Sequence, residues 1–191
     1  MRKLVFVVLL LAATMAFGDE LAAGAKAPGF SLVNAVDGKT IEMKPDDGKL
    51  KVVVFTCNKC PYAKAFEPRL IELANRFTHK GAHFYLVNPN DIPDESPAHM
   101  KARAVDQQYP FPYLKDGDSS VARAYGARVT PHVFVVDGTG TVRYRGYVDD
   151  SAKPAERQVE GLTGALNALL NGREIARTET KAFGCTIKWK G

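Results

Sequence analysis

Cysteine is scarce in this chain: only three of its 191 residues are cysteines. Small extracellular proteins that depend on disulfide bridges carry more cysteines in a shorter chain, so the composition argues against that class. The sequence also has a single Cys-x-x-Cys motif, whereas two such motifs are the strong signature of a structural zinc site. A chain of this length can instead bury a hydrophobic core of its own.

Long blocks of basic residues are absent, as are basic residues interleaved with aromatic ones. The chain has 26 lysines and arginines against 21 aspartates and glutamates, and the basic residues are scattered along it. This pattern does not indicate nucleic acid as a partner. Internal repeats and low-complexity segments are absent too, which favours one domain.

One apolar run, residues 4–17, stands out near the N-terminus and follows Arg2 and Lys3. It is shorter than the roughly 20 residues that span a membrane. A basic start, a short apolar stretch and small residues at its end predict a secretory signal over residues 1–18. We therefore expect a periplasmic or secreted protein. Removal of the two basic residues leaves 24 basic against 21 acidic ones, a net charge of +3; membrane contact would need an uncleaved signal.

The remaining pattern predicts the element order β-β-β-α-β-α-β-α-β-β-α. Turns at Asp37-Gly38 and Asp137-Gly138 indicate hairpins over residues 30–43 and 132–148. The apolar runs 51–55 and 82–88 do not alternate, as is typical of strands buried on both faces. Apolar residues three and four apart, together with capping residues, predict four helices. We place these helices over residues 63–79, 97–108, 119–125 and 154–170.

This order predicts an α/β fold in which a mixed central sheet has helices on both faces, with an N-terminal hairpin. Residues 19–172 form the domain and residues 173–191 a tail. Cys185 lies 13 residues beyond Gly172, and a tail of that length reaches ~43 Å when extended, whereas the last helix, about 17 residues, is only ~25 Å long. The tail can therefore fold back over the domain and bring Cys185 to the other cysteines.

Cys57 and Cys60 lie in "FTCNKCPYA", where a central strand ends and a helix begins. A helix N-terminus carries about half a positive charge and unpaired N–H groups. Such an environment favours a thiolate and lowers a cysteine pKa from ~8.5 into a range of about 3.5–7.5. Since the thiolate is the form that attacks disulfides, we expect Cys57 to attack and Cys60 to resolve. Lys59 between them would support the negative charge.

The strand, the Cys-x-x-Cys at a helix start, and "VTPHVFVVDGTGTVRYRG" downstream together resemble the thioredoxin superfamily. The resemblance covers roughly residues 25–172 and is strongest to exported thioredoxin-like and alkyl-hydroperoxide-reductase/thiol-specific-antioxidant (redoxin) proteins. It implies a three-layer sandwich and a cis proline facing the cysteines, here Pro131 after Thr130, which would bind the partner's backbone. It also implies a monomer without a cofactor. Its partners would be exported thiol or disulfide proteins and an upstream thiol electron donor.

The sequence departs from thioredoxin around the motif. Thr56 replaces the tryptophan before the first cysteine, and Asn58-Lys59 replace the Gly-Pro between the pair. The preceding strand has no acidic residue, and Lys51 falls near the place of thioredoxin's buried aspartate. The aspartate's role in proton transfer therefore has no direct counterpart. We expect Glu95, in the loop after "YLVN", to be a candidate substitute.

Two further functions remain open. Peroxiredoxins follow their attacking cysteine with proline, as Cys60-Pro61 does, although Cys57 takes the place of their threonine. A peroxidase of this kind would attack peroxide with Cys60 and resolve with Cys57. The third hypothesis is metal delivery: Cys57, Cys60, Cys185 and His132 could form a Cys₃His zinc site or hold Cu(I).

Cys185, in "FGCTIKW", has two interpretations. The tail could bring it to the redox pair as a resolving or regulatory cysteine. Alternatively, it is an inert cysteine buried beside Phe183, Ile187 and Trp189.

Overall fold

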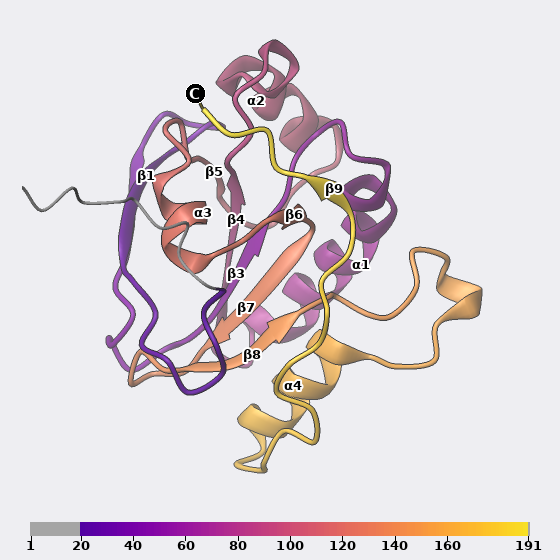
Figure 1. The fold of residues 1–191 in the computed structure, drawn as a ribbon. Helices are drawn as coiled ribbons and strands as arrows, with labels where there is room; N and C mark the ends of the chain where they lie inside the picture. The colour runs from indigo at the N-terminus through magenta and orange to yellow at the C-terminus, as the bar shows by residue number, and fades with distance from the viewer. Residues whose placement is uncertain (1–19, 191) are drawn as a thin grey trace, which may run out of the picture.

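The computed structural model describes residues 20–190, and the expected signal segment 1–18 lies outside this part of the chain. A seven-stranded mixed sheet forms its centre, in the order β2-β1-β5-β4-β3-β7-β8 (Figure 1). The parallel pairs are β3–β4 and β4–β5, and the other pairs are antiparallel. The strands are β1 (Phe30–Asn34), β2 (Thr40–Met43), β3 (Leu50–Phe55), β4 (Ala82–Asn88), β5 (Tyr113–Lys115), β7 (His132–Val136) and β8 (Val142–Gly146).

Helices cover both faces of this sheet, which confirms the predicted α/β sandwich with its N-terminal hairpin. Helices α1 (Pro61–Thr78), α2 (Pro97–Asp106) and α4 (Gly161–Leu170) contribute to the hydrophobic cluster on one face. Helix α3 (Ser120–Tyr125) contributes to the cluster on the other face. None of the helices within residues 20–190 is long and apolar enough to cross a membrane.

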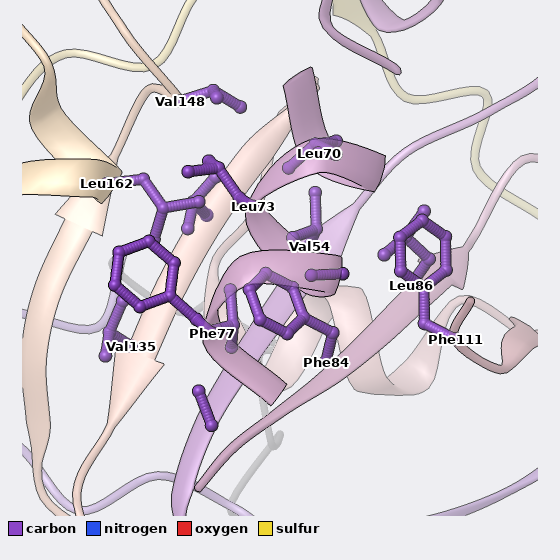
Figure 2. Close-up of a cluster of buried hydrophobic side chains, with 14 of the residues drawn as sticks. Val54, Leu70, Leu73, Phe77, Phe84, Leu86, Phe111, Val135, Val148 and Leu162 are labelled. Carbon is purple, nitrogen blue, oxygen red and sulfur yellow. The ribbon is translucent and has the colours of Figure 1, made fainter. Parts of the chain in front are cut away.

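The larger cluster shows why the periodicity of α1 predicts a helix. Leu70, Leu73 and Phe77 are spaced by three and four residues and lie on the same face of α1. They pack among buried side chains of the sheet and of α4 (Figure 2). The labelled partners in this view are Val54, Phe84, Leu86, Phe111, Val135, Val148 and Leu162. Burial of this apolar face supplies the main driving force for docking α1.

Strand β3 lies in the middle of the sheet, between β4 and β7. Residues 51–55 are all buried, and their side chains alternate between the two hydrophobic clusters. A strand covered on both faces needs apolar residues at successive positions, which explains the absence of alternation. Lys51 is the exception: its ammonium group donates to the backbone oxygens of Pro45 (2.8 Å) and Lys49 (2.9 Å). It thereby closes the loop before β3.

The last helix is shorter than predicted, because the expected start at Pro154 is wrong. Residues Pro154–Glu156 form a separate 3₁₀ turn, η2, and α4 begins only at Gly161. The intervening backbone is bonded to Asp150, whose carboxylate accepts the N–H of Gln158 (2.9 Å). No residue of η2 is buried, whereas Leu162 and Leu166 are fully buried. Helix formation therefore starts where an apolar face becomes available for packing.

Two short strands form a second, two-stranded sheet. Strand β6 (Val129–Thr130) precedes β7, and strand β9 (Cys185–Thr186) lies in the C-terminal segment. They pair antiparallel, with Val129 opposite Thr186 and Thr130 opposite Cys185. In Figure 1 the yellow C-terminal segment runs from α4 back over the domain to β9, beside β6.

Candidate active site

Cys57 and Cys60 lie at the junction of β3 and α1, where the sequence predicts them. Cys60 is the N-cap residue of α1, with an extended backbone, and its sulfur accepts the N–H of Ala63 at 3.4 Å. Pro61 follows at the first helical position, where a missing N–H carries no penalty. Both cysteines are reduced and buried, with exposed fractions of 4% and 3%. The helix N-terminus is therefore directed at Cys60.

The Thr130-Pro131 peptide bond is cis, as the family resemblance implies, and it lies beside both sulfurs. The hydroxyl of Thr130 is 3.2 Å from the Cys57 sulfur, and its carbonyl oxygen is 3.2 Å from the Cys60 sulfur. In its thiol form Cys60 donates to that carbonyl. Thr130 is fully buried, so its polar groups are committed to the two cysteines and to β9. The structure thus brings all four of these predicted residues together.

Glu95, which is fully buried, holds the loop between the cysteines. Its carboxylate oxygens accept the backbone N–H groups of Asn58 (2.8 Å) and Lys59 (2.9 Å). A third donor, the side-chain amide of Asn88, reaches it at 2.8 Å. The structure therefore shows Glu95 bonded to the loop backbone. Hydrogen bonds to a buried carboxylate of this kind are strong because the surroundings have a low dielectric constant.

A polar network that the sequence does not predict extends from Glu95. Tyr113, fully buried, donates to the side-chain oxygen of Asn58 at 3.0 Å, and Asn88 donates to the Tyr113 hydroxyl at 3.0 Å. The only sequence signal for these residues is their place next to strand ends. Lys59 lies outside this network: its ammonium is 3.0 Å from Asp94, and both side chains are more than half exposed. Its charge is directed at Asp94.

The two sulfurs have opposite proton affinities. The hydrogen bond from the Cys57 thiol lowers the pKa of Cys60 to about 4, against the effect of burial; Cys185 and the Ala63 N–H also favour the Cys60 thiolate. The same bond, followed by burial, raises the pKa of Cys57 far above its usual range. The expectation that the helix N-terminus acidifies Cys57 is therefore wrong for this reduced state. The physical reason is that the Cys57 thiol donates to the Cys60 sulfur, which as N-cap also receives the N–H of Ala63.

Cys185 lies next to this pair. It is partly exposed and packs against the cluster formed by Cys57, Cys60 and Ala63. Burial and the Cys60 sulfur raise the pKa of Cys185 to about 11, so that its thiol is a donor towards Cys60. Its neighbours Phe183 and Ile187 do pack, but in separate hydrophobic clusters.

The described residues do not assemble a metal site. Among residues 20–190, no three His, Cys, Asp or Glu side chains are grouped so that they could hold a metal ion. His132, the nitrogen ligand of the metal hypothesis, stacks on Phe134 and lies 2.9 Å from Glu20. The geometry therefore gives the metal-delivery hypothesis no support.

Two cysteines at a strand-to-helix junction, beside a cis proline at the end of the neighbouring strand of a mixed sheet, define a thioredoxin-like protein. The sequence model of the AhpC/TSA family matches residues 23–145. The chain therefore belongs to the AhpC/TSA family, the redoxin branch of the thioredoxin superfamily.

The chain is also similar to solved structures and to a curated relative. A conserved protein from Geobacillus kaustophilus is 37% identical, with a TM-score of 0.82 over 92% of this chain and 94% of that one. A hypothetical protein from Sinorhizobium meliloti is 31% identical, with a TM-score of 0.83 over 91% of this chain and 97% of that one. The thiol-disulfide oxidoreductase ResA of Bacillus thuringiensis subsp. konkukian is 26% identical over 124 residues, 65% of this chain and 69% of that protein.

Replacing Glu95 with glutamine tests its hold on the loop. The amide retains one acceptor but turns its own N–H groups towards buried donors, so we expect the free energy of unfolding to fall by about 1–3 kcal/mol. Urea denaturation of the reduced protein measures this loss. Asp94→Asn is the matched control, because Asp94 makes an exposed ion pair and should change stability by less than about 1 kcal/mol. Equal stability of Glu95→Gln and wild type would contradict the assignment.

The pKa of Cys60 predicts the pH dependence of thiolate absorbance in the reduced protein. Because this pKa is lowered, the ultraviolet thiolate signal should persist below neutrality and disappear only as the pH approaches about 4. Cys60→Ser should remove the signal at neutral pH. Cys57→Ala should keep it but shift its loss to higher pH, since the largest stabilising donor is gone. Loss of the wild-type signal near the ordinary cysteine pKa of ~8.5 would contradict the prediction.

Proposed function

We propose that this protein is an exported thiol–disulfide oxidoreductase whose Cys57–Cys60 pair cycles between dithiol and disulfide. The observation that carries the proposal is the pair of buried, reduced cysteines whose sulfurs each lie 3.2 Å from an oxygen of Thr130, beside the cis Thr130-Pro131 bond. Membership of the AhpC/TSA family and similarity to a thiol-disulfide oxidoreductase support it. Export is proposed from the N-terminal pattern over residues 1–18. The partners are exported thiol or disulfide proteins and an upstream thiol donor, and the protein acts as a monomer without a cofactor.

In this proposal Cys57 attacks and Cys60 resolves. As the Cys57 sulfur attacks a partner's disulfide, its proton passes along the shared hydrogen bond to the Cys60 thiolate, which acts as the base. One partner sulfur leaves as a thiolate, and the other is bonded to Cys57. Cys60 then gives up the proton to a partner thiolate and attacks Cys57, which breaks the bond between Cys57 and the partner's second sulfur. The partner leaves with both sulfurs reduced, and the pair holds the disulfide until a thiol donor returns two electrons.

Trapping of partners tests this order. Cys60→Ala should accumulate mixed disulfides through Cys57, because the resolving sulfur is gone and Cys57 no longer has the neighbour that raises its pKa most. Cys57→Ala should accumulate few, since the attacking sulfur is gone; it is made together with Cys185→Ser, because Cys185 packs beside Cys60 and could release a partner bound there. Non-reducing gels of protein incubated with an unfolded disulfide protein measure both. If Cys57→Ala traps partners as well as Cys60→Ala, the order of attack is wrong.

A thiol peroxidase is the second candidate function, favoured by the lowered pKa of Cys60 and by the Cys60-Pro61 sequence. The Cys60 thiolate would attack one oxygen of the peroxide, releasing water or alcohol and leaving a sulfenic acid. The Cys57 thiol would then displace water to form the disulfide. We expect a reduced Cys57→Ser, Cys185→Ser variant to accumulate sulfenic acid at Cys60 when hydrogen peroxide is added. Oxidation no faster than that of a free thiol would remove this candidate.

A further inference from the structure

The C-terminal strand β9 occupies the edge beside the cis proline. Thr130, whose backbone is expected to pair with a partner, already pairs with Cys185 of the same chain. Adding a strand to an exposed edge is a general way for a protein to bind an extended peptide. The chain therefore holds its own segment in the position of an incoming peptide, with a cysteine at the point closest to the active-site sulfurs.

Gly184 allows this close approach. Its φ is +154°, and a Cβ atom built there would lie 2.0 Å from the carbonyl oxygen of Thr130. No side chain fits in that space, so only glycine lets the segment come this close to the cis peptide. The same carbonyl oxygen is 3.2 Å from the Cys60 sulfur. The close contact of Gly184 with Thr130 therefore also places Cys185 next to Cys60.

Further contacts hold the segment on both sides of Cys185. On one side, the ring of Phe183 packs against Phe66 of α1, with 5.7 Å between ring centroids. On the other, the N–H of Ile187 donates to the carbonyl of Arg128 (3.0 Å), and the N–H of Lys188 donates to the side-chain oxygen of Asn90 (2.8 Å). Ile187 itself is buried, with 2% exposed. The strand is therefore bound as an integral part of the domain.

We propose that Cys185 is a third redox-active residue, which takes over the disulfide from the buried pair as a Cys60–Cys185 bond. The inference rests on the proposed function. Cys185 is the cysteine with partial exposure, whereas Cys57 and Cys60 are almost completely covered. A thiol donor must bring its sulfur into line with a disulfide bond, and a bond that includes Cys185 is the more accessible one.

The step is a disulfide exchange that needs no added oxidant. The Cys185 sulfur attacks Cys60 in the Cys57–Cys60 disulfide, and a Cys60–Cys185 bond forms as the Cys57–Cys60 bond breaks. Cys57 leaves as a thiolate and takes up the proton that Cys185 lost. One disulfide is present before and after, so two oxidising equivalents move from the buried pair to the surface. An upstream donor then attacks Cys185 and reduces the bond.

Peptide mapping tests the proposal, because trypsin separates the three cysteines. Cleavage after Lys51, Lys59, Lys64, Lys181 and Lys188 places Cys57 in peptide 52–59, Cys60 in 60–64 and Cys185 in 182–188. The reduced full chain is oxidised with limiting oxidised glutathione, blocked with N-ethylmaleimide in acid, digested and analysed by mass spectrometry. We expect peptide 60–64 linked to 182–188, besides 60–64 linked to 52–59. Complete blocking of Cys185 with only the second linkage would overturn the proposal.

Three variants and one control variant make the mapping specific. Cys57→Ser should form the Cys60–Cys185 bond within one molecule, and Cys60→Ser should form no Cys57–Cys185 bond. Gly184→Ala should lower the yield of the Cys60–Cys185 peptide at least several-fold, because its Cβ displaces β9 from Thr130. Gly164→Ala in α4, where a Cβ meets nothing within 4 Å, is the matched control and should leave that yield unchanged. If Gly184→Ala does not fold, the disulfides found in the wild-type protein and in the two cysteine variants still test the proposal.

The outcomes separate this inference from the proposed function. If wild-type protein forms the Cys57–Cys60 disulfide and exchanges it with partners, but never links Cys60 to Cys185, the inference about Cys185 is wrong and the proposed function stands. If no cysteine pair of the protein exchanges with glutathione, both the proposed function and the inference about Cys185 are wrong. If Cys57→Ser gives only intermolecular dimers through Cys60, Cys185 is not positioned to react and the inference is likewise overturned.

Discussion

The antiparallel pairing of β3 with β7 is the constraint on which the rest of the site depends. Phe55, the last residue of β3, lies opposite His132, the first residue of β7. This register places the chain just after β3, with Cys57, beside the chain just before β7, with Thr130. A shift by one residue would turn the side chains of β3 to the opposite faces of the sheet. Because residues 52–55 are apolar towards both faces, the pairing with β7, and not the apolar pattern of β3, fixes the position of the sulfurs.

Around these sulfurs the protein uses buried polar groups that bond to one another and to the loop between the cysteines. Glu95 accepts the N–H groups of the loop, and Tyr113 and Asn88 complete the network. Such groups are costly to bury and contribute little net stability, but they define one loop conformation. The loop that carries the cysteines is consequently rigid for a physical reason. A short loop on a rigid scaffold is suited to holding two sulfurs within reach of each other.

Much of the fold follows from local sequence signals, and the failures come from long-range contacts. The hairpin at Asp37-Gly38 and the strand over 82–88 are set by turn chemistry and by burial on both faces, and both are confirmed. The predicted start of the last helix at Pro154 is wrong because residues 154–160 include capping and helix-forming residues but have no surface to pack on. The proton affinities at the cysteines depend on which side chains converge there. Motif spacing shows two sulfurs and a helix, but not that the second sulfur is the cap.

Chain length sets how far the C-terminal segment can reach, not where it binds. Its docking depends on Gly184, which fits one place on the surface. The docking of this segment also affects the backbone of β6. A strand edge without a neighbour presents unpaired N–H and C=O groups, to which another molecule can add its own strand. By covering that edge, β9 pairs the backbone groups of Val129 and Thr130 within the chain, so that they do not form an open strand edge.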